Sequence, residues 1–458
     1  MCPLLFVTVS VIILYPVDSI WPSIIPPPPK LDYHEWWGPE ENTTQDTSIR
    51  PFRVHFNESM IKDLRTRLTH HRPFTPPLEG IGFQYGFNTD TLESWVQYWA
   101  QDYPFAEREN YINKYPQFKT NIQGLDIHFV WVKPEVCGNK KVVPLLLLHG
   151  WPSSILEFYR AVPFLTTLSD GRDFVLELII PSLPGFGYSD SAVRPGLGPV
   201  EIGVVLRNFM HRLGHQQFYI QGGDAGSIIG SIMATIFPKE VLGYHTNFGI
   251  VLDPKALILI AGMAVNPYLF MDPKLVHRLY PLTKTIEFLL EESGYFLIQA
   301  TKPDTVGVGL TDSPSGLLAY ILEKYSTSTN KEYRQLKDGG LTRKYTRDEL
   351  IDILMIYWTS NCITTSMRLY AETTSKKELA FRTYETPTTV PTWVIQAEHE
   401  LIYEPPNALR VKYHNLVNVT AIPYGGHFLA LELPQVFSED VLDAIKTFRG
   451  SRTAKIKL

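Results

Sequence analysis

The sequence predicts an α/β protein with a doubly wound, mostly parallel sheet and a helical cap inserted before the last strands. Continuous aliphatic runs at 142–148 and 174–181 are typical of strands that are covered on both faces. Helical spacing follows them, as in 200–213, so strands and helices alternate along this part of the chain. The strand pattern then lapses between about 250 and 385 and resumes at 392–397, which indicates a helical insertion that covers a site.

These changes of pattern divide the chain into five expected parts. In order they are an N-terminal membrane anchor, a proline-rich linker with an aromatic-rich helical extension, the first part of the α/β core, the helical cap, and the second part of the core: 1–25, 26–117, 118–250, 251–385 and 386–458.

The composition excludes several function classes. The chain has 458 residues, of which 44% are hydrophobic, and a net charge of −5, so it can bury a large core. It has no long Lys/Arg run, which argues against nucleic acid as a partner. Its three cysteines, Cys2, Cys137 and Cys362, are too few and too scattered for a disulfide framework or a zinc site.

Residues 4–17 form an apolar segment of about 14 residues, which is short of the ~20 that a helical membrane span needs. The segment lacks a basic leader and a clear small-x-small cleavage site, so we predict an anchor, with a cleaved signal as the alternative. The prolines at 26–29 would form a stiff spacer. Lys30, Arg50 and Arg53 then favour a cytosolic body by the positive-inside rule.

The extension that follows is expected to be helical, because apolar residues recur at helical spacing in 58–70 and in 92–99. It is rich in tryptophan. We expect these tryptophans to pack against a larger body, since buried packing is commoner for tryptophan than cofactor binding. They are Trp36, Trp37, Trp95 and Trp99.

The core is expected to open with a hairpin, 118–123 and 126–132, that turns at Gly124. Ligands of open α/β sheets bind outside the carboxyl ends of the strands. The loops at 149–152 and 185–189 each follow a predicted strand, so we expect both to lie at the site.

Helical spacing predicts cap helices at 275–290, 316–325 and 350–357. After the strand at 392–397, a last strand at 419–423 and a closing helix at 436–448 complete the expected core.

The stretch around Asp224 has the layout of a strand that turns sharply into a helix. Glycines at 222, 223 and 226 surround this one acidic residue, and an apolar helical run resumes at Ser227. In the Gly-x-nucleophile-x-Gly pattern the central residue takes a strained backbone conformation that only small neighbours permit. Asp224 therefore takes the place of a nucleophile, close to a helix N-terminus that favours an anion. The alternative is a glycine-rich turn with a capping aspartate.

A carboxylate nucleophile needs a base that activates water, and histidine suits that role near neutral pH. His427 is the histidine in the glycine-bracketed loop after the last predicted strand. The order nucleophile, acid, histidine is the one that α/β-hydrolases use, which places the acid after 392–397. Glu398, Glu400 and Glu404 all follow that strand, and the pattern does not separate them from one another or from solvated loop charges.

Backbone N–H groups are what an oxyanion needs, and two are well placed in the sequence. Trp151 lies in the His-Gly-Trp-Pro turn and Ala225 follows Asp224 directly, so we expect these two residues to form an oxyanion hole. The alternative for Trp151 is packing alone.

The chain resembles the microsomal-type epoxide hydrolases, most closely the juvenile hormone epoxide hydrolases of insects. The resemblance covers nearly the whole chain and is specific because several motifs occur together. These are Asp32-Tyr-His-Glu-Trp-Trp-Gly-Pro39, His149-Gly-Trp-Pro152, Gly222-Gly-Asp-Ala-Gly-Ser227, Glu292-Ser-Gly-Tyr-Phe-Leu-Ile-Gln299, Thr301-Lys-Pro-Asp-Thr305, Asp312-Ser-Pro-Ser-Gly316 and Gly425-Gly-His-Phe428.

The resemblance implies that Asp224 is the nucleophile and His427 the base. It selects Glu400 as the acid, because the Glu-Leu-Ile context of that residue matches the acid motif of the family. It also implies that Tyr295 and Tyr370, in the cap, hold the epoxide oxygen.

One position departs from the pattern. Many relatives have Trp after the nucleophilic Asp, whereas this chain has Ala225. Since the position contributes its backbone N–H, catalysis should survive with a differently shaped pocket. The same alanine argues against a haloalkane dehalogenase, which usually holds its halide with a Trp N–H there.

The predicted function is the hydrolysis of lipophilic epoxides, juvenile hormone in particular, to diols through an ester on Asp224. The reaction needs an epoxide and water, with a membrane as a further partner through the N-terminus, and no metal or organic cofactor. The alternatives are a broad xenobiotic epoxide hydrolase and a catalytically silent carrier of hydrophobic ligands. A serine esterase is disfavoured because Asp occupies the elbow, although Ser153 and Ser227 lie nearby in the sequence.

Overall fold

The computed structural model describes residues 29–41, 43–135, 140–168 and 171–456. The anchor predicted at 1–25 lies outside the described residues, as does most of the proline spacer. Within the described ranges, no helix is long and apolar enough to cross a membrane.

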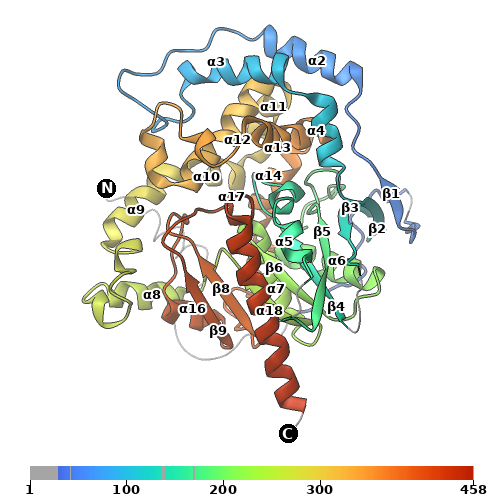
Figure 1. Ribbon diagram of the computed structural model, residues 1–458, viewed down its shortest axis with the longest axis vertical. Coiled ribbons are helices and arrows are strands. Elements are labelled where there is room, and N and C mark those ends of the chain that lie inside the picture. The colour runs from blue at the N-terminus through green and yellow to red at the C-terminus, as the bar shows by residue number, and fades with distance from the viewer. Residues whose placement is uncertain (1–28, 42, 136–139, 169–170, 457–458) are drawn as a thin grey trace.

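A nine-stranded sheet forms the centre of the molecule (Figure 1). Its order is β1-β2-β3-β5-β4-β6-β7-β8-β9; β1, β2, β3 and β5 pair antiparallel, and the neighbours from β5 to β9 pair parallel. The strands are β1 (Arg50–Phe52), β2 (Gln117–Ile122), β3 (Leu125–Val132), β4 (Lys141–Leu148), β5 (Phe174–Pro181), β6 (Phe218–Gly222), β7 (Val241–Thr246), β8 (Thr392–Gln396) and β9 (Leu416–Ala421). The predicted fold class is confirmed.

The winding of the sheet reverses around β4, which pairs with β5 on one side and with β6 on the other. At its carboxyl end Leu148 pairs with Gly222 of β6, so the loop after β4 lies beside the elbow after β6. Such a reversal is where open α/β sheets bind ligands.

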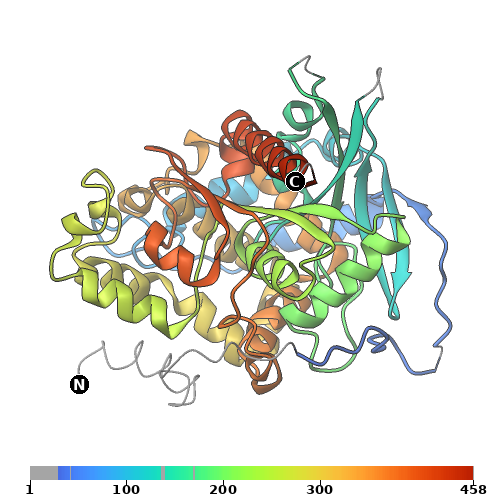
Figure 2. The same ribbon diagram turned by 90° about the horizontal axis from the view of Figure 1, so that it is seen from below.

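Helices cover both faces of the sheet (Figure 2). In that view α18 (Pro434–Ile456) lies above the strands, and α6 (Pro199–Arg212) and α7 (Asp224–Ile236) lie below them. The remaining core helices are short: η3 (Ile155–Phe158), α5 (Val162–Thr166), α16 (Pro406–Lys412) and α17 (Leu429–Glu432).

Between β7 and β8 every element is helical, which agrees with the predicted cap. The elements are α8 (Pro254–Met263), η4 (Pro267–Leu269), η5 (Val276–Arg278), α9 (Leu282–Glu292), α10 (Gly294–Thr301), α11 (Pro303–Asp312), α12 (Pro314–Thr329), η6 (Lys331–Gln335), η7 (Leu341–Arg343), α13 (Arg347–Ser360), α14 (Ile363–Thr373) and α15 (Lys376–Ala380).

The single helix predicted at 275–290 was wrong. A short 3₁₀ turn, η5, is followed by a break, and α9 begins only at Leu282. Pro281 accounts for the break, because proline lacks the N–H that a helix needs and disfavours helical geometry in the residue before it.

The helices of the N-terminal extension pack against the cap, whereas its strand β1 joins the sheet. These helices are α2 (Glu58–Thr69), α3 (Thr89–Gln97), the π-helical turn η2 (Tyr98–Asp102) and α4 (Phe105–Ile112). The Tyr103 hydroxyl donates to Asp352 Oδ1 of α13 at 2.8 Å, and Arg108 Nε donates to the same oxygen at 3.0 Å. Trp37, Trp95 and Trp99 are buried, as expected, and Trp36 is half-buried.

Two strands were not predicted. β1 is only Arg50–Phe52 and contains a proline, so it carries no strand pattern, yet it pairs with β2. β7 reads Val-Leu-Gly-Tyr-His-Thr, and its glycine and polar residues interrupt the aliphatic run that marks the other parallel strands.

Candidate active site

The elbow after β6 forces Asp224 into a strained conformation. Its φ is 46°, in the left-handed region that non-glycine residues seldom adopt, and it is the first residue of α7. A Cβ on Gly222 would collide with the backbone of Gly226, and one on Gly226 would collide with the backbone of Leu148. The two glycines therefore let β6, α7 and β4 approach closely enough to present Asp224 at the edge of the sheet.

The loop after β4 supplies a donor to Asp224. The Trp151 N–H donates to Asp224 Oδ1 at 2.8 Å, and the Ala225 N–H also hydrogen-bonds this carboxylate. Gly150 lies so close that a Cβ there would overlap the carboxylate itself. Both residues predicted to form an oxyanion hole thus donate backbone hydrogen bonds to the Asp224 carboxylate.

His427 connects Asp224 with Glu400. Its Nδ1 lies 2.7 Å from Glu400 Oε1, and its Nε2 lies 3.3 Å from Asp224 Oδ2. The backbone of His427 is fixed on both sides, since its N–H donates to the carbonyl of Ser328 at 2.7 Å and its own carbonyl accepts from Asn247 at 3.1 Å. The imidazole is therefore positioned by both the core and the cap helix α12.

Neighbouring charges set the protonation states of His427 and Asp224. Burial acts to lower the pKa of His427, but the negative charges of Glu400 and Asp224 and the hydrogen bonds to both raise that pKa well above its ordinary value. Burial acts to raise the pKa of Asp224, but His427 and the two backbone N–H groups lower it. The resting site accordingly holds an Asp224 carboxylate paired with a protonated His427.

The three glutamates that the sequence left open occupy different environments. Glu400 is buried against His427. Glu398 instead forms ion pairs with Arg278 and His277. Glu404 is buried, and burial raises its pKa to about 8, so it is neutral near pH 7.

Two cap tyrosines face the loop after β4. Tyr295 of α10 stacks on Trp151 with ring centroids 5.5 Å apart, and Tyr370 of α14 meets the same indole edge-on at 6.0 Å. The two tyrosine rings are 6.1 Å from each other. Burial raises the pKa of both phenols, and the nearby Asp224 charge raises it further, so both remain protonated donors near neutral pH.

Comparisons with known proteins agree with this geometry. Residues 49–158 match the family described as "Epoxide hydrolase N terminus", and residues 143–276 match "alpha/beta hydrolase fold". The juvenile hormone epoxide hydrolase of Bombyx mori is 54% identical over 461 residues, which cover 100% of both chains. Epoxide hydrolase 1 of Sus scrofa is 41% identical over 89% of this chain and 91% of its own. This chain belongs to the epoxide hydrolase family.

Solved structures agree as well. The crystal structure of the silkworm juvenile hormone epoxide hydrolase superposes on this epoxide hydrolase with a TM-score of 0.91, at 56% identity, and covers 92% of this chain and 100% of that chain. The Aspergillus niger epoxide hydrolase shares the fold, with a TM-score of 0.71 at 24% identity over 91% of this chain.

Sequence patterns did not single out one buried acid of this epoxide hydrolase, Glu157. Glu157 lies in η3 and is 4% exposed. Burial raises its pKa to about 7, and the group is near enough to interact with His427, Asp224 and Glu400. Glu157 belongs to no recognisable sequence motif, so only the fold reveals that it lies near His427, Asp224 and Glu400.

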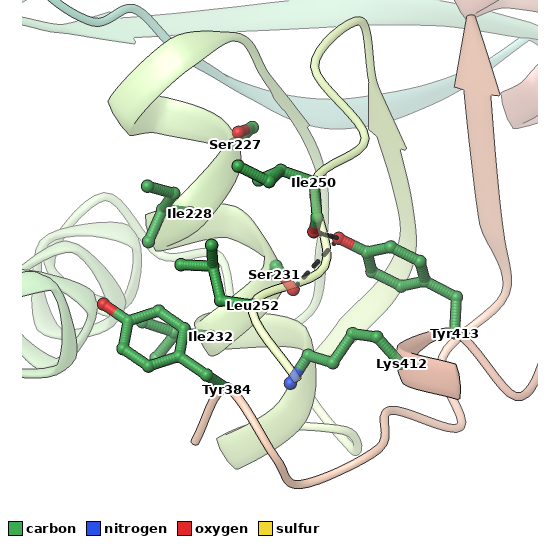
Figure 3. Close-up of a pocket in the computed structure, with 9 residues that line it drawn as sticks. All are labelled: Ser227, Ile228, Ser231, Ile232, Ile250, Leu252, Tyr384, Lys412 and Tyr413. Atoms are coloured by element: carbon green, nitrogen blue, oxygen red, sulfur yellow. Dashed lines mark hydrogen bonds between the residues drawn. The ribbon is translucent and has the colours of Figure 1, made fainter. Parts of the chain in front are cut away.

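A small pocket beside α7 is separate from this chemistry (Figure 3). Serines of α7 line it together with Lys412 and Tyr413, and it contains none of the seven predicted site residues. Lys412 Nζ donates to Thr235 Oγ1 at 3.0 Å and to the carbonyl of Thr383 at 2.6 Å, and burial lowers its pKa to about 7. Lys412 is therefore a buried structural residue that connects α7 with the segment after α15 by hydrogen bonds.

Among the described residues, no group of three or more His, Cys, Asp or Glu side chains is arranged to hold a metal ion.

Proposed function

We propose that this epoxide hydrolase converts lipophilic epoxides to diols, with juvenile hormone as its substrate. The observation that carries the proposal is the chain of contacts from Glu400 through His427 to Asp224, with Tyr295 and Tyr370 opposite. Four relatives that are 46–54% identical bear the name juvenile hormone epoxide hydrolase, which supports the choice of substrate.

In the first step Asp224 Oδ2 attacks an epoxide carbon. Oδ1 already accepts from the Trp151 N–H, so Oδ2 is the oxygen left to react. The carbon–oxygen bond of the epoxide breaks as the new bond to Oδ2 forms, and Tyr295 and Tyr370 donate hydrogen bonds to the leaving oxygen. That oxygen takes up the resting proton of His427, which leaves the imidazole neutral and able to act as a base. The product is a hydroxyalkyl ester whose carbonyl oxygen is Oδ1.

In the second step His427 takes a proton from water, and the resulting hydroxide attacks the Asp224 carboxyl carbon. The N–H groups of Trp151 and Ala225 hold the developing oxyanion on Oδ1. The bond between the carboxyl carbon and Oδ2 then breaks, the leaving alkoxide takes the proton from His427, and the diol leaves. The new carboxyl group of Asp224 passes its proton to His427, which restores the resting ion pair.

The electrostatics favour this order of events. Before the reaction Asp224 is one of the two negative charges that raise the pKa of His427. Ester formation neutralises Asp224. The pKa of His427 therefore falls, because one of the two negative charges that stabilise its protonated form is gone. The imidazole thereby becomes a better base in the half-reaction that needs one, while Glu400 keeps it oriented.

We also propose that residues 1–25 attach the enzyme to the endoplasmic reticulum membrane with the catalytic body in the cytosol. The apolar run at 4–17 supports this proposal. The segments 26–117, 118–250, 251–385 and 386–458 are proposed as extension, first core part, cap and second core part.

The test is diol formation from juvenile hormone and, in parallel, from a bulky aromatic epoxide, by the wild type and by Asp224→Ala. Turnover of the hormone at low substrate concentration that vanishes in the variant is the expected result. Faster turnover of the aromatic epoxide would favour a detoxifying role. Binding of the hormone without conversion of either substrate would favour the carrier.

A further inference from the structure

One edge of the cap exposes an unusual number of large apolar side chains. Of the twenty such side chains that are exposed in the described chain, eleven lie between residues 257 and 308. Six of the eleven lie on α8, α9 and α10. Figure 1 shows these three helices along one side of the molecule, away from β1 and β2. Contiguous apolar patches on soluble proteins generally mark a contact surface.

The densest part is residues 254–270, from α8 through η4, which we call the α8–η4 lobe. Its exposed apolar side chains are Leu257, Ile258, Val265, Tyr268, Leu269 and Phe270. Val265 is 92% exposed and Leu269 is 74% exposed. The only charged residue in these 17 positions is Lys255, at the first turn of α8. The lobe therefore presents an apolar tip to its surroundings with its single charge at the base.

The start of the described chain lies on the same side as the lobe. Leu31 packs on the cluster that also holds Leu252, two residues before α8 begins. The apolar segment at 4–17 is joined to Leu31 by a linker that spans at most roughly 50 Å when fully extended. The apolar segment of the sequence at 4–17 is thus tethered within roughly 50 Å of Leu31.

We propose that the α8–η4 lobe docks on a lipid bilayer, as a second membrane contact beside the N-terminal segment. An aliphatic tip with an amphipathic tyrosine suits the boundary between headgroups and acyl chains. Lys255, at the base of the lobe, is exposed and available to phosphate headgroups.

Docking of the lobe would bring the candidate active site close to substrate that is dissolved in the bilayer. α10 carries Tyr295 toward Trp151, whereas its neighbours Leu297 and Ile298 are exposed on the same apolar edge. A lipophilic epoxide that leaves the bilayer would meet the cap before it meets water. This consequence rests on the proposed reaction, and the docking rests on the proposed membrane attachment but not on the reaction.

The test uses the full chain, with Cys2→Ser and Cys137→Ser and the buried Cys362 retained. An environment-sensitive fluorophore is attached at Leu269→Cys, and as a matched control at Val142→Cys, which is 41% exposed at the start of β4. Each protein is reconstituted with phosphatidylcholine vesicles that contain spin-labelled lipid. We expect a blue shift and loss of most emission for the label at 269, and neither for the label at 142.

Equal responses at the two positions would overturn the proposal. A blue shift at 269 that grows with protein concentration in the absence of lipid would assign the lobe to a contact between two copies. A shift that needs neither lipid nor concentration would mean that the N-terminal segment of the same chain covers the lobe. Because the readout needs no turnover, failure of the docking is distinguishable from failure of the proposed reaction.

Discussion

Replacement of Glu400 by glutamine should arrest the enzyme at the ester. The carboxylate lies 2.7 Å from His427 Nδ1 and is buried, so its charge acts on the imidazole with little screening. Glutamine keeps the shape and one acceptor oxygen but removes the charge that stabilises the imidazolium. The step that creates this imidazolium is the hydrolysis of the ester, and it should slow most.

The distance sets the size of the effect. Two unit charges 2.7 Å apart attract by about 6 kcal/mol at an effective dielectric constant of 20. Desolvation and the hydrogen bond that glutamine retains offset part of this, which leaves a net loss of about 2–4 kcal/mol. Since each 1.36 kcal/mol changes a rate tenfold, hydrolysis of the ester should slow by about 30- to 1000-fold.

The chain offers two matched controls. Glu398→Gln removes a charge that is paired with Arg278 and His277 rather than with the base. Glu404→Gln removes a carboxyl whose pKa is about 8, so almost no charge is lost near pH 7. Both variants should keep most of the wild-type kcat.

Rapid mixing of each variant with substrate, acid quenching and intact-protein mass spectrometry would measure the two steps separately. For Glu400→Gln we expect the ester to form quickly and to persist. The reasoning is refuted if Glu404→Gln is equally impaired, or if ester formation and ester hydrolysis slow by the same factor.

The other predictions concern the cap, the loop after β4 and the buried acid beneath the site. Tyr295→Phe and Tyr370→Phe should each slow ester formation by on the order of 10²-fold without changing its hydrolysis, which single-turnover kinetics would show. Gly150→Ala should lower kcat by at least about 10²-fold because its Cβ would displace the nucleophile's carboxylate, whereas Gly262→Ala, which has open space around it, should retain wild-type kcat in the same assay. Glu157 has a pKa near 7 in the folded state against 4.5 ordinarily, so the stability it contributes is complete below about pH 4.5 and is lost as the pH rises through 7. Between pH 5 and pH 8 the free energy of unfolding of the wild type should therefore fall by about 2–3 kcal/mol more than that of Glu157→Gln, as measured by urea unfolding at both pH values.

The sequence predicts the parallel core well because its signals are local. Strands such as β4 and β5 are covered on both faces and are therefore continuously aliphatic, and the turn glycines around Asp224 are required by close backbone approaches. One missed element depends on a partner elsewhere, since β1 exists only because β2 offers it an edge. The break before α9 was misjudged although its cause, one proline inside an otherwise helical pattern, is local.

The residues of the candidate site also differ in whether the local sequence identifies them. Asp224 and His427 could be predicted from the residues because a strained elbow and a glycine-bracketed loop constrain the local sequence. The acid was not, because a carboxylate needs no particular neighbours in the chain: only the path of the loop after β8 brings Glu400 to His427 and turns Glu398 toward Arg278. The tyrosines were named only from a family resemblance, since their position depends on how the cap lies over Trp151. A residue whose role is created by tertiary contact has no local signal, and Glu157 shows that this holds even within a few residues of a strong motif.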